Sequence, residues 1–200
     1  MGFSRHKTAP KVRDGKVQHK NRHSQTPRYP DIKNKPIIHR ERPGFGCQQL
    51  ITKKQLFQFI DLLPNWNELS EGLDLILLAE GDSSLLGWYR PGIVAICAWE
   101  TELQKEWDID FVEEHDVVLD RLGVDREPSE DEDTELCLFD RNSARGFQLM
   151  HIFLHELGHH HDLMTTRSQA DCCRGEDFAE DYANRYADQL WDKYFKIFPY

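Results

Sequence analysis

The stretch "FLHELGHHHD", Phe153 to Asp162, holds four histidines and one glutamate between residues 155 and 161. No proline occurs from Ser143 to His161, and apolar side chains recur there at helical spacing. This pattern predicts an amphipathic helix over residues 143–161. His155 and His159 are four residues apart, so they project from the same face of that helix, one turn from each other.

The motif His-Glu-x-x-His on a helix is typical of zinc enzymes. Two imidazoles one turn apart can bind a single Zn²⁺ at roughly 2.0–2.1 Å. Glu156 is rotated by about 100° around the helix, which places its carboxylate beside the metal, where a bound water would lie. We interpret His151, His160 and His161 as neighbours of the site and not as ligands, although His151 also stands four residues from His155.

Gly158 lies inside the predicted helix, where glycine costs about 1 kcal/mol relative to alanine. We expect another backbone or a substrate to approach the helix closely at this position.

A second amphipathic helix is predicted in "GEDFAEDYANRYADQLWDKYFKIF", residues 175–198. Glu176, Glu180 and Asn184 follow one another at four-residue intervals, so they share a face. The small side chains of Ala183 and Ala187 would let this helix pack tightly on the first. A catalytic zinc usually has three protein ligands, and a carboxylate from this helix would be the third. Spacing alone leaves both Glu176 and Glu180 open for that role.

"LHELGHH" followed by "EDYANRYA" resembles the minimal gluzincin-type zinc metallopeptidases, and within them the ImmA/IrrE group most closely, over about 40 residues from Phe147 to Ala187. The resemblance implies a zincin-like α+β domain, in which a small β-sheet precedes the active-site helix and a ligand-bearing helix closes the chain. It implies Zn²⁺ as the cofactor and Glu180 as the third ligand beside His155 and His159. Asn184, one turn beyond Glu180, is then placed to hold a ligand imidazole.

The activity implied by the resemblance is zinc-dependent hydrolysis of peptide bonds in an intracellular protein substrate, with Glu156 as the general base. The donor that stabilises the oxyanion stays open among four candidates: Tyr182, Tyr186, His160 and His161. One alternative function is a zinc-binding sensor or interaction domain that cleaves nothing. Another is a nucleic-acid-associated protein that binds through its basic N-terminal residues and uses the zinc domain as effector.

Residues 1–46 are more basic and richer in proline than the rest of the chain. Residues 1–46 contain 12 Lys+Arg and 3 Asp+Glu, whereas the whole chain has a formal charge of −10. Five of the nine prolines lie within residues 1–43, and large apolar side chains are few there. Such a segment buries too little surface to offset its ordering entropy. We therefore predict a disordered basic arm over residues 1–43 and a metallopeptidase domain over residues 44–200. The arm either contacts nucleic acid or an acidic partner, or is a solvated tail.

The region between the arm and the motif predicts several strands. A helix begins at Thr52 and ends near Pro64, and a buried strand covers Leu73–Ala79. A β-hairpin turns at Pro91–Gly92. The acidic run of residues 125–135 is expected to be a loop, followed by a short strand at residues 136–140. Because these strands precede the two closing helices, the fold class is α+β. The stretch "FVEEHDVVLDRLGV" (residues 111–124) is compatible with either a strand or a helix.

The chain shows no secretory signal, and its longest apolar runs are too short to cross a bilayer. Five cysteines without regular spacing make a disulfide framework improbable and favour a reducing compartment. We therefore expect a cytoplasmic protein without a membrane partner. The adjacent Cys172 and Cys173 could form a metal or redox site, but we interpret them as loop residues without a function.

Overall fold

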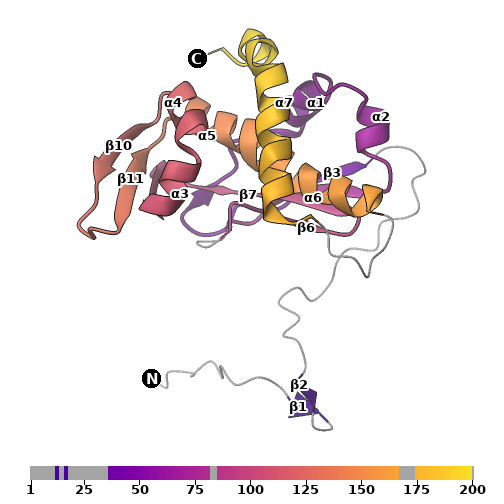
Figure 1. Ribbon diagram of the computed structural model, residues 1–200, viewed down its shortest axis with the longest axis horizontal. Helices are drawn as coiled ribbons and strands as arrows, with labels where there is room; N and C mark the ends of the chain where they lie inside the picture. Colours follow the sequence, from indigo (N-terminus) through magenta and orange to yellow (C-terminus); the bar gives the residue numbers. More distant parts are fainter. Residues whose placement is uncertain (1–11, 14–15, 18–35, 82–84, 167–173, 200) are drawn as a thin grey trace. The chain divides into compact units, whose positions relative to one another are not determined.

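A computed structural model describes residues 12–13, 16–17, 36–81, 85–166 and 174–199 of the chain (Figure 1). The chain divides into two compact units, Met1–Ile32 and Lys33–Tyr200. In the first unit the described residues form two antiparallel strands, β1 (Val12–Arg13) and β2 (Lys16–Val17). The rest of the predicted basic arm, up to residue 35, lies outside the described residues.

The second unit has the α+β architecture predicted from the sequence. Its main sheet has the strand order β3-β5-β7-β6, in which β5 is parallel to both β3 and β7, and β6 is antiparallel to β7. The four strands are β3 (Ile37–Arg40), β5 (Leu75–Ala79), β6 (Gly87–Arg90) and β7 (Ile93–Cys97). The predicted hairpin is confirmed: β6 and β7 flank Pro91–Gly92, and Gly92 has φ +80°.

Strand β3 corrects the predicted boundary of the arm. Ile37–Arg40 falls inside the segment of residues 1–43, yet it pairs with the buried strand β5 along its whole length. Hydrogen bonds from the amide of Ile37 to Asp74 and from the amide of Glu41 to Leu78 extend this pairing at both ends. The ordered domain therefore begins before residue 37, because a four-residue strand gains its stability from a distant partner and not from its own composition.

Between β3 and β5 the chain forms α1 (Lys53–Ile60) and α2 (Trp66–Leu69). Thr52 is the N-cap of α1, as predicted, and it shares a capping box with Gln55. The helix ends at Ile60, four residues before Pro64.

The second unit also contains two smaller sheets. One has the order β10-β11-β9, and the other pairs β4 with β8. Their strands are β4 (Cys47–Gln48), β8 (Trp99–Glu100), β9 (Gln104–Asp108), β10 (Asp125–Pro128) and β11 (Thr134–Leu138). In the acidic run of residues 125–135, only residues 129–133 are a loop. The prediction of a loop is wrong for the two ends of the run, which form β10 and the start of β11, because the paired backbones of this hairpin leave the carboxylates largely exposed. The ambiguous stretch is helical, and it forms α3 (Ile109–Glu114) and α4 (Asp116–Arg121).

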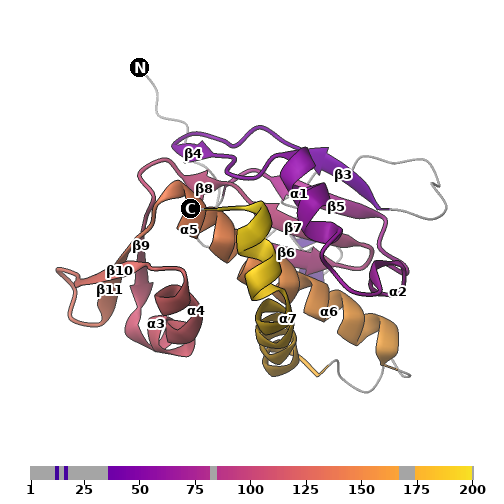
Figure 2. The same ribbon diagram turned by 90° about the horizontal axis from the view of Figure 1, so that it is seen from above.

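The predicted motif helix consists of three consecutive segments, α5 (Arg141–Phe147), the π-helical turn η1 (Gln148–Ile152) and α6 (Phe153–Thr165). Asp140 caps the first of them through the amides of Asn142 and Ser143. The closing helix is α7 (Glu176–Ile197). Figure 1 shows α7 crossing α6 at a steep angle, and Figure 2 shows α6 running along the edge of the main sheet that carries β6.

Two apolar cores hold these elements together. The larger one joins one face of the main sheet to α1, α6 and α7, with fully buried Phe59, Phe153 and Leu157 near its centre. The smaller one joins α3, α4 and the β9–β11 sheet to α5, around Trp99 and Phe147. The α5–η1–α6 segment contributes to both cores, and this fixes the position of the motif histidines.

No helix in the described part of the chain has both the length and the apolar character needed to cross a membrane.

The position of β3 leads to a truncation experiment. Deleting residues 1–43 should lower the melting temperature strongly, since it removes a paired strand and the buried Ile38, whose loss alone is worth about 2 kcal/mol or more. Deleting residues 1–32 should leave it nearly unchanged, because the compact unit begins at Lys33. Calorimetry of both chains measures the difference, and equal melting temperatures would contradict the assignment of β3 to the core.

Candidate metal centre

Close packing of α6 on α7 creates the site. A Cβ atom placed on Gly158 would lie 2.9 Å from Cα of Ala179 and 3.1 Å from Cβ of Tyr182. The absence of a side chain at Gly158 therefore lets the two helix backbones approach each other, as predicted for this position. Ala183 is fully buried nearby, in agreement with its predicted role in the same contact. This approach brings the first two turns of α7 to the histidine face of α6.

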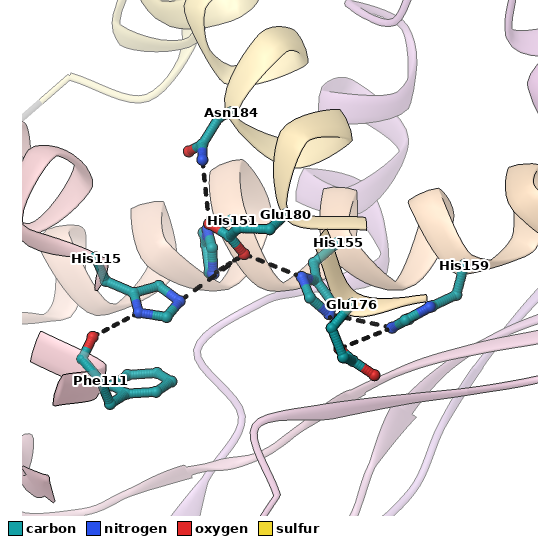
Figure 3. A network of polar contacts seen from close by, with 8 residues as sticks. All are labelled: Phe111, His115, His151, His155, His159, Glu176, Glu180 and Asn184. Carbon is teal, nitrogen blue, oxygen red and sulfur yellow. Dashed lines mark hydrogen bonds and ion pairs between the residues drawn. The ribbon is translucent and has the colours of Figure 1, made fainter. Parts of the chain in front are cut away.

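Three ligand atoms converge at the start of α7. Nε2 of His155 lies 3.1 Å from Nε2 of His159, and Oε2 of Glu176 lies 3.1 Å from the former and 3.3 Å from the latter (Figure 3). Ligands of a tetrahedral zinc at roughly 2.0–2.1 Å are separated by roughly 3.3–3.4 Å from one another. The two imidazoles and the carboxylate thus already have the mutual spacing of a zinc site, and the residues fit that ion.

Glu180, which was predicted to be the third ligand, takes a different position. Its Oε2 lies 3.2 Å from Nδ1 of His155, on the side of the ring that faces away from His159. Asn184 donates a hydrogen bond from Nδ2 to Oε1 of Glu180 at 3.1 Å, and so it holds the carboxylate and not an imidazole. Glu176 thus contacts both motif histidines at Nε2, whereas Glu180 contacts only His155, at its other ring nitrogen.

The contact between Glu180 and Nδ1 of His155 determines which ring nitrogen of this histidine carries the proton. A carboxylate accepts a hydrogen only from a protonated ring nitrogen, so Glu180 keeps the proton of His155 on Nδ1 and leaves the lone pair on Nε2. Metal-binding histidines commonly carry such a carboxylate on their second nitrogen. Burial lowers the pKa of His155, but the hydrogen bond to Glu180 and the charges of the surrounding glutamates raise it above its ordinary value. The same negative surroundings favour a metal cation.

Glu156 lies beside these ligands under the edge strand β6. A Cβ atom on Gly87 would approach Oε1 of Glu156 to 2.9 Å, so only glycine leaves room for the carboxylate at this point of the strand. Burial raises the pKa of Glu156 to about 7, with His155 opposing the rise and Glu176 adding to it. A carboxylate with a pKa near neutrality is suited to both accept and return a proton.

Glu156 lines a cavity of about 340 Å³. The side chains that carry its chemistry are those of His115, His151, His155, Glu156, Glu176 and Glu180. The four open candidates for the oxyanion donor do not line it within the described part of the chain. His160, for example, is hydrogen-bonded through Nε2 to the carbonyl of Glu71, and His161 stacks on Phe178.

Asp162 connects the end of α6 to the beginning of α7. Its buried carboxylate accepts hydrogen bonds from Arg174 Nε at 2.6 Å and from the amide of Gly175 at 3.3 Å. Gly175 is the N-cap of α7, so this anchor sets the place at which Glu176 emerges. No local sequence pattern indicates this role, since it depends on how the chain returns from the end of α6 to the start of α7. The adjacent Cys172 and Cys173 lie outside the described residues.

His115 and His151 also line the cavity, although neither is a site residue in the sequence-based prediction. His151 was interpreted as a neighbour and His115 was not considered, but both line the cavity, and their Nε2 atoms lie 3.6 Å and 3.9 Å from Oε2 of Glu180. The i, i+4 relation to His155 was the only sequence signal for His151. No local pattern marks His115, which reaches the site from the junction of α3 and α4.

Comparison with protein-family models, with curated proteins and with solved structures found no match to this chain.

Gly158 gives a direct test of the helix contact. On helix propensity alone, Gly158→Ala would stabilise the protein by about 1 kcal/mol. Because the added Cβ would collide with the backbone at Ala179, we expect the opposite: a lower melting temperature and weaker zinc binding. Gln189→Ala, at an exposed position of α7, is the control and should change stability by less than about 0.5 kcal/mol. A rise in melting temperature for Gly158→Ala would show that the helices are not in close contact.

Proposed function

We propose that this protein is a zinc-dependent peptidase with a zincin-like active site. One observation carries the proposal: the Nε2 atoms of His155 and His159 and a carboxylate oxygen of Glu176 lie 3.1–3.3 Å from one another, with Glu156 buried beside them. The resemblance of the motif to gluzincin-type metallopeptidases supports the same reaction class. In this proposal Glu176 replaces Glu180 as the third ligand.

A peptide substrate is supported by the position of the sheet edge. β6 is the last strand of the main sheet, and its Gly87 lines the cavity next to Glu156. An extended peptide can pair with the backbone of an edge strand, which aligns its carbonyl groups along the strand. Such a peptide would pass over the cavity with one peptide bond close to Glu156.

The residues of the chain divide the work of hydrolysis. A zinc ion held by His155, His159 and Glu176 would supply a Lewis acid that acidifies water and polarises the scissile carbonyl. Glu156 accepts a proton from the attacking water, whose oxygen bonds to the carbonyl carbon. As the C–N bond breaks, the same carboxyl group passes the proton to the leaving nitrogen. Glu180 keeps the His155 ring in one orientation and one tautomer throughout.

The ligand assignment can be tested by comparing the two glutamates. Glu176→Ala should release the zinc bound between His155 and His159, because it removes a ligand atom. Glu180→Ala should keep that zinc with an affinity lower by about 10–100-fold, because His155 loses the group that orients it. A competition titration of zinc against a chromophoric chelator measures both.

Asp177→Ala is the matched control, since this exposed carboxylate lies in the same first turn of α7 and interacts equally with the helix dipole. Its zinc affinity should equal that of the unchanged protein. Retention of zinc in Glu176→Ala together with its loss in Glu180→Ala would return the third-ligand role to Glu180.

The role of Glu156 is tested by Glu156→Gln. The amide keeps the shape of the side chain but cannot accept the proton, so zinc should remain while peptide hydrolysis falls by about 10²-fold or more. Cleavage is measured by mass spectrometry on a mixture of unstructured peptides, with the exposed Glu113→Gln as a control of unchanged activity. Loss of zinc in Glu156→Gln, or unchanged cleavage, would refute the role. An unchanged protein that binds zinc but cleaves no peptide would favour the sensor alternative.

A further inference from the structure

A second group of potential ligands lies beside the first. It consists of His115 at the junction of α3 and α4, His151 in η1 and Glu180 in α7. One potential ligand atom of each residue lies within 4.8 Å of those of the other two. Both histidines are buried, with 7% and 3% of their surface exposed, and Glu180 is half-buried. Figure 3 shows the two imidazoles pointing at Oε2 of Glu180 from the side opposite His155.

The ring of His115 has a fixed orientation. Its Nδ1 lies 2.6 Å from the carbonyl oxygen of Phe111, which can only accept, so Nδ1 carries the hydrogen. In the neutral ring Nε2 then has a lone pair directed at the carboxylate of Glu180, 3.9 Å away. Two acceptors that face each other in a buried site require a proton or a cation between them. A backbone carbonyl on the second nitrogen is also the usual partner of a metal-binding histidine.

The position of His151 results from an irregular helix. In an uninterrupted α-helix His151 and His155 would share one face. The π-helical turn changes the phase of η1 relative to α6, and such turns occur frequently at functional sites. The His151 ring is stacked on Phe147 at 5.0 Å and meets the edge of His115 at 4.5 Å. It is thereby held next to the lone pair of His115.

Glu180 has the capacity to take part in both groups. Its Oε1 accepts from Asn184, and its Oε2 accepts from His155. A carboxylate oxygen has two lone-pair sites, so Oε2 can accept that hydrogen bond and still bind a cation.

The cavity also carries negative charge that a cation would offset. Four glutamates line it, namely Glu114, Glu156, Glu176 and Glu180, and among the described residues no lysine or arginine does. Glu114 and Glu176 are exposed to solvent, so the carboxylates that water does not compensate are the buried Glu156 and the half-buried Glu180.

We propose that His115, His151 and Glu180 form a second divalent-cation site, with zinc as its preferred ion. Two imidazoles and one carboxylate suit zinc best among the common ions. Binding requires the three ligand atoms to move closer together, since Nε2 of His115 and Nε2 of His151 lie 3.9 Å and 3.6 Å from Oε2 of Glu180 and zinc ligands are roughly 3.3–3.4 Å apart. A cation there would fix the carboxylate that orients His155. The inference concerns a different ligand set from the proposed catalytic site and stands independently of it.

The experiment is a zinc titration of the full chain with metal content determined by mass spectrometry. The key variant is His115→Asn, since the amide nitrogen of asparagine can keep the hydrogen bond to the carbonyl of Phe111, while the shorter side chain lacks the Nε2 ligand atom and its amide oxygen is not a usual zinc ligand. The unchanged protein should bind two zinc ions, His115→Asn one, His159→Ala one, and the double variant none. His161→Asn, in α6 but outside both groups, is the control and should bind two. Histidines 6, 19 and 23 are present in every variant, so they do not affect the comparison.

The outcomes separate the two sites. One zinc in the unchanged protein that is kept in His115→Asn and lost in His159→Ala would overturn the second site and leave the proposed catalytic site intact. One zinc that is lost in His115→Asn and kept in His159→Ala would support the second site and overturn the proposed catalytic one. No zinc at all would overturn both. Thermal unfolding of His115→Asn in the presence of a chelator verifies that this variant folds.

Discussion

The contact between the backbones of α6 and α7 at Gly158 is the constraint on which the site depends. Only at this short separation can carboxylates from α7 reach imidazoles on α6, because each side chain spans only a few ångströms from its helix axis. Asp162 sets the register of that contact by tying the N-cap of α7 to the end of α6. The contact and the anchor together place Glu176 next to the Nε2 atoms of both motif histidines and Glu180 next to Nδ1 of His155.

The electrostatics follow from this arrangement. Burial and hydrogen bonding act on each group in a different direction: His155 is made more basic, His159 less basic, and Glu156 less acidic. Burial also lowers the pKa of His151 to about 3, so this ring stays neutral near neutrality. Imidazole nitrogens and carboxylate oxygens gathered in one place are the kind of ligands that a borderline divalent ion such as zinc prefers.

Much of this arrangement was predictable from local patterns. Helical periodicity located both closing helices, the His-Glu-x-x-His spacing identified the histidine face of α6, and Gly158 indicated a close approach of another backbone. The remaining features depend on contacts that no local pattern contains. The strand β3 exists because β5 lies beside it, and His115 reaches the cavity because α3 and α4 pack on α5. The choice between Glu176 and Glu180 depends on where α7 begins, which the Asp162 anchor determines and helical spacing alone does not.

The proposed function requires that histidine and carboxylate side chains of this chain bind zinc. X-ray absorption spectroscopy at the zinc edge of the purified protein tests it most directly, because it reports the ligand atoms and their distances without reference to any substrate. The expected spectrum shows only nitrogen and oxygen neighbours at roughly 2.0–2.2 Å, with the outer-shell scattering of imidazole rings. Sulfur neighbours at roughly 2.3 Å, or a shell without imidazole, would place the metal elsewhere in the chain and contradict the claim.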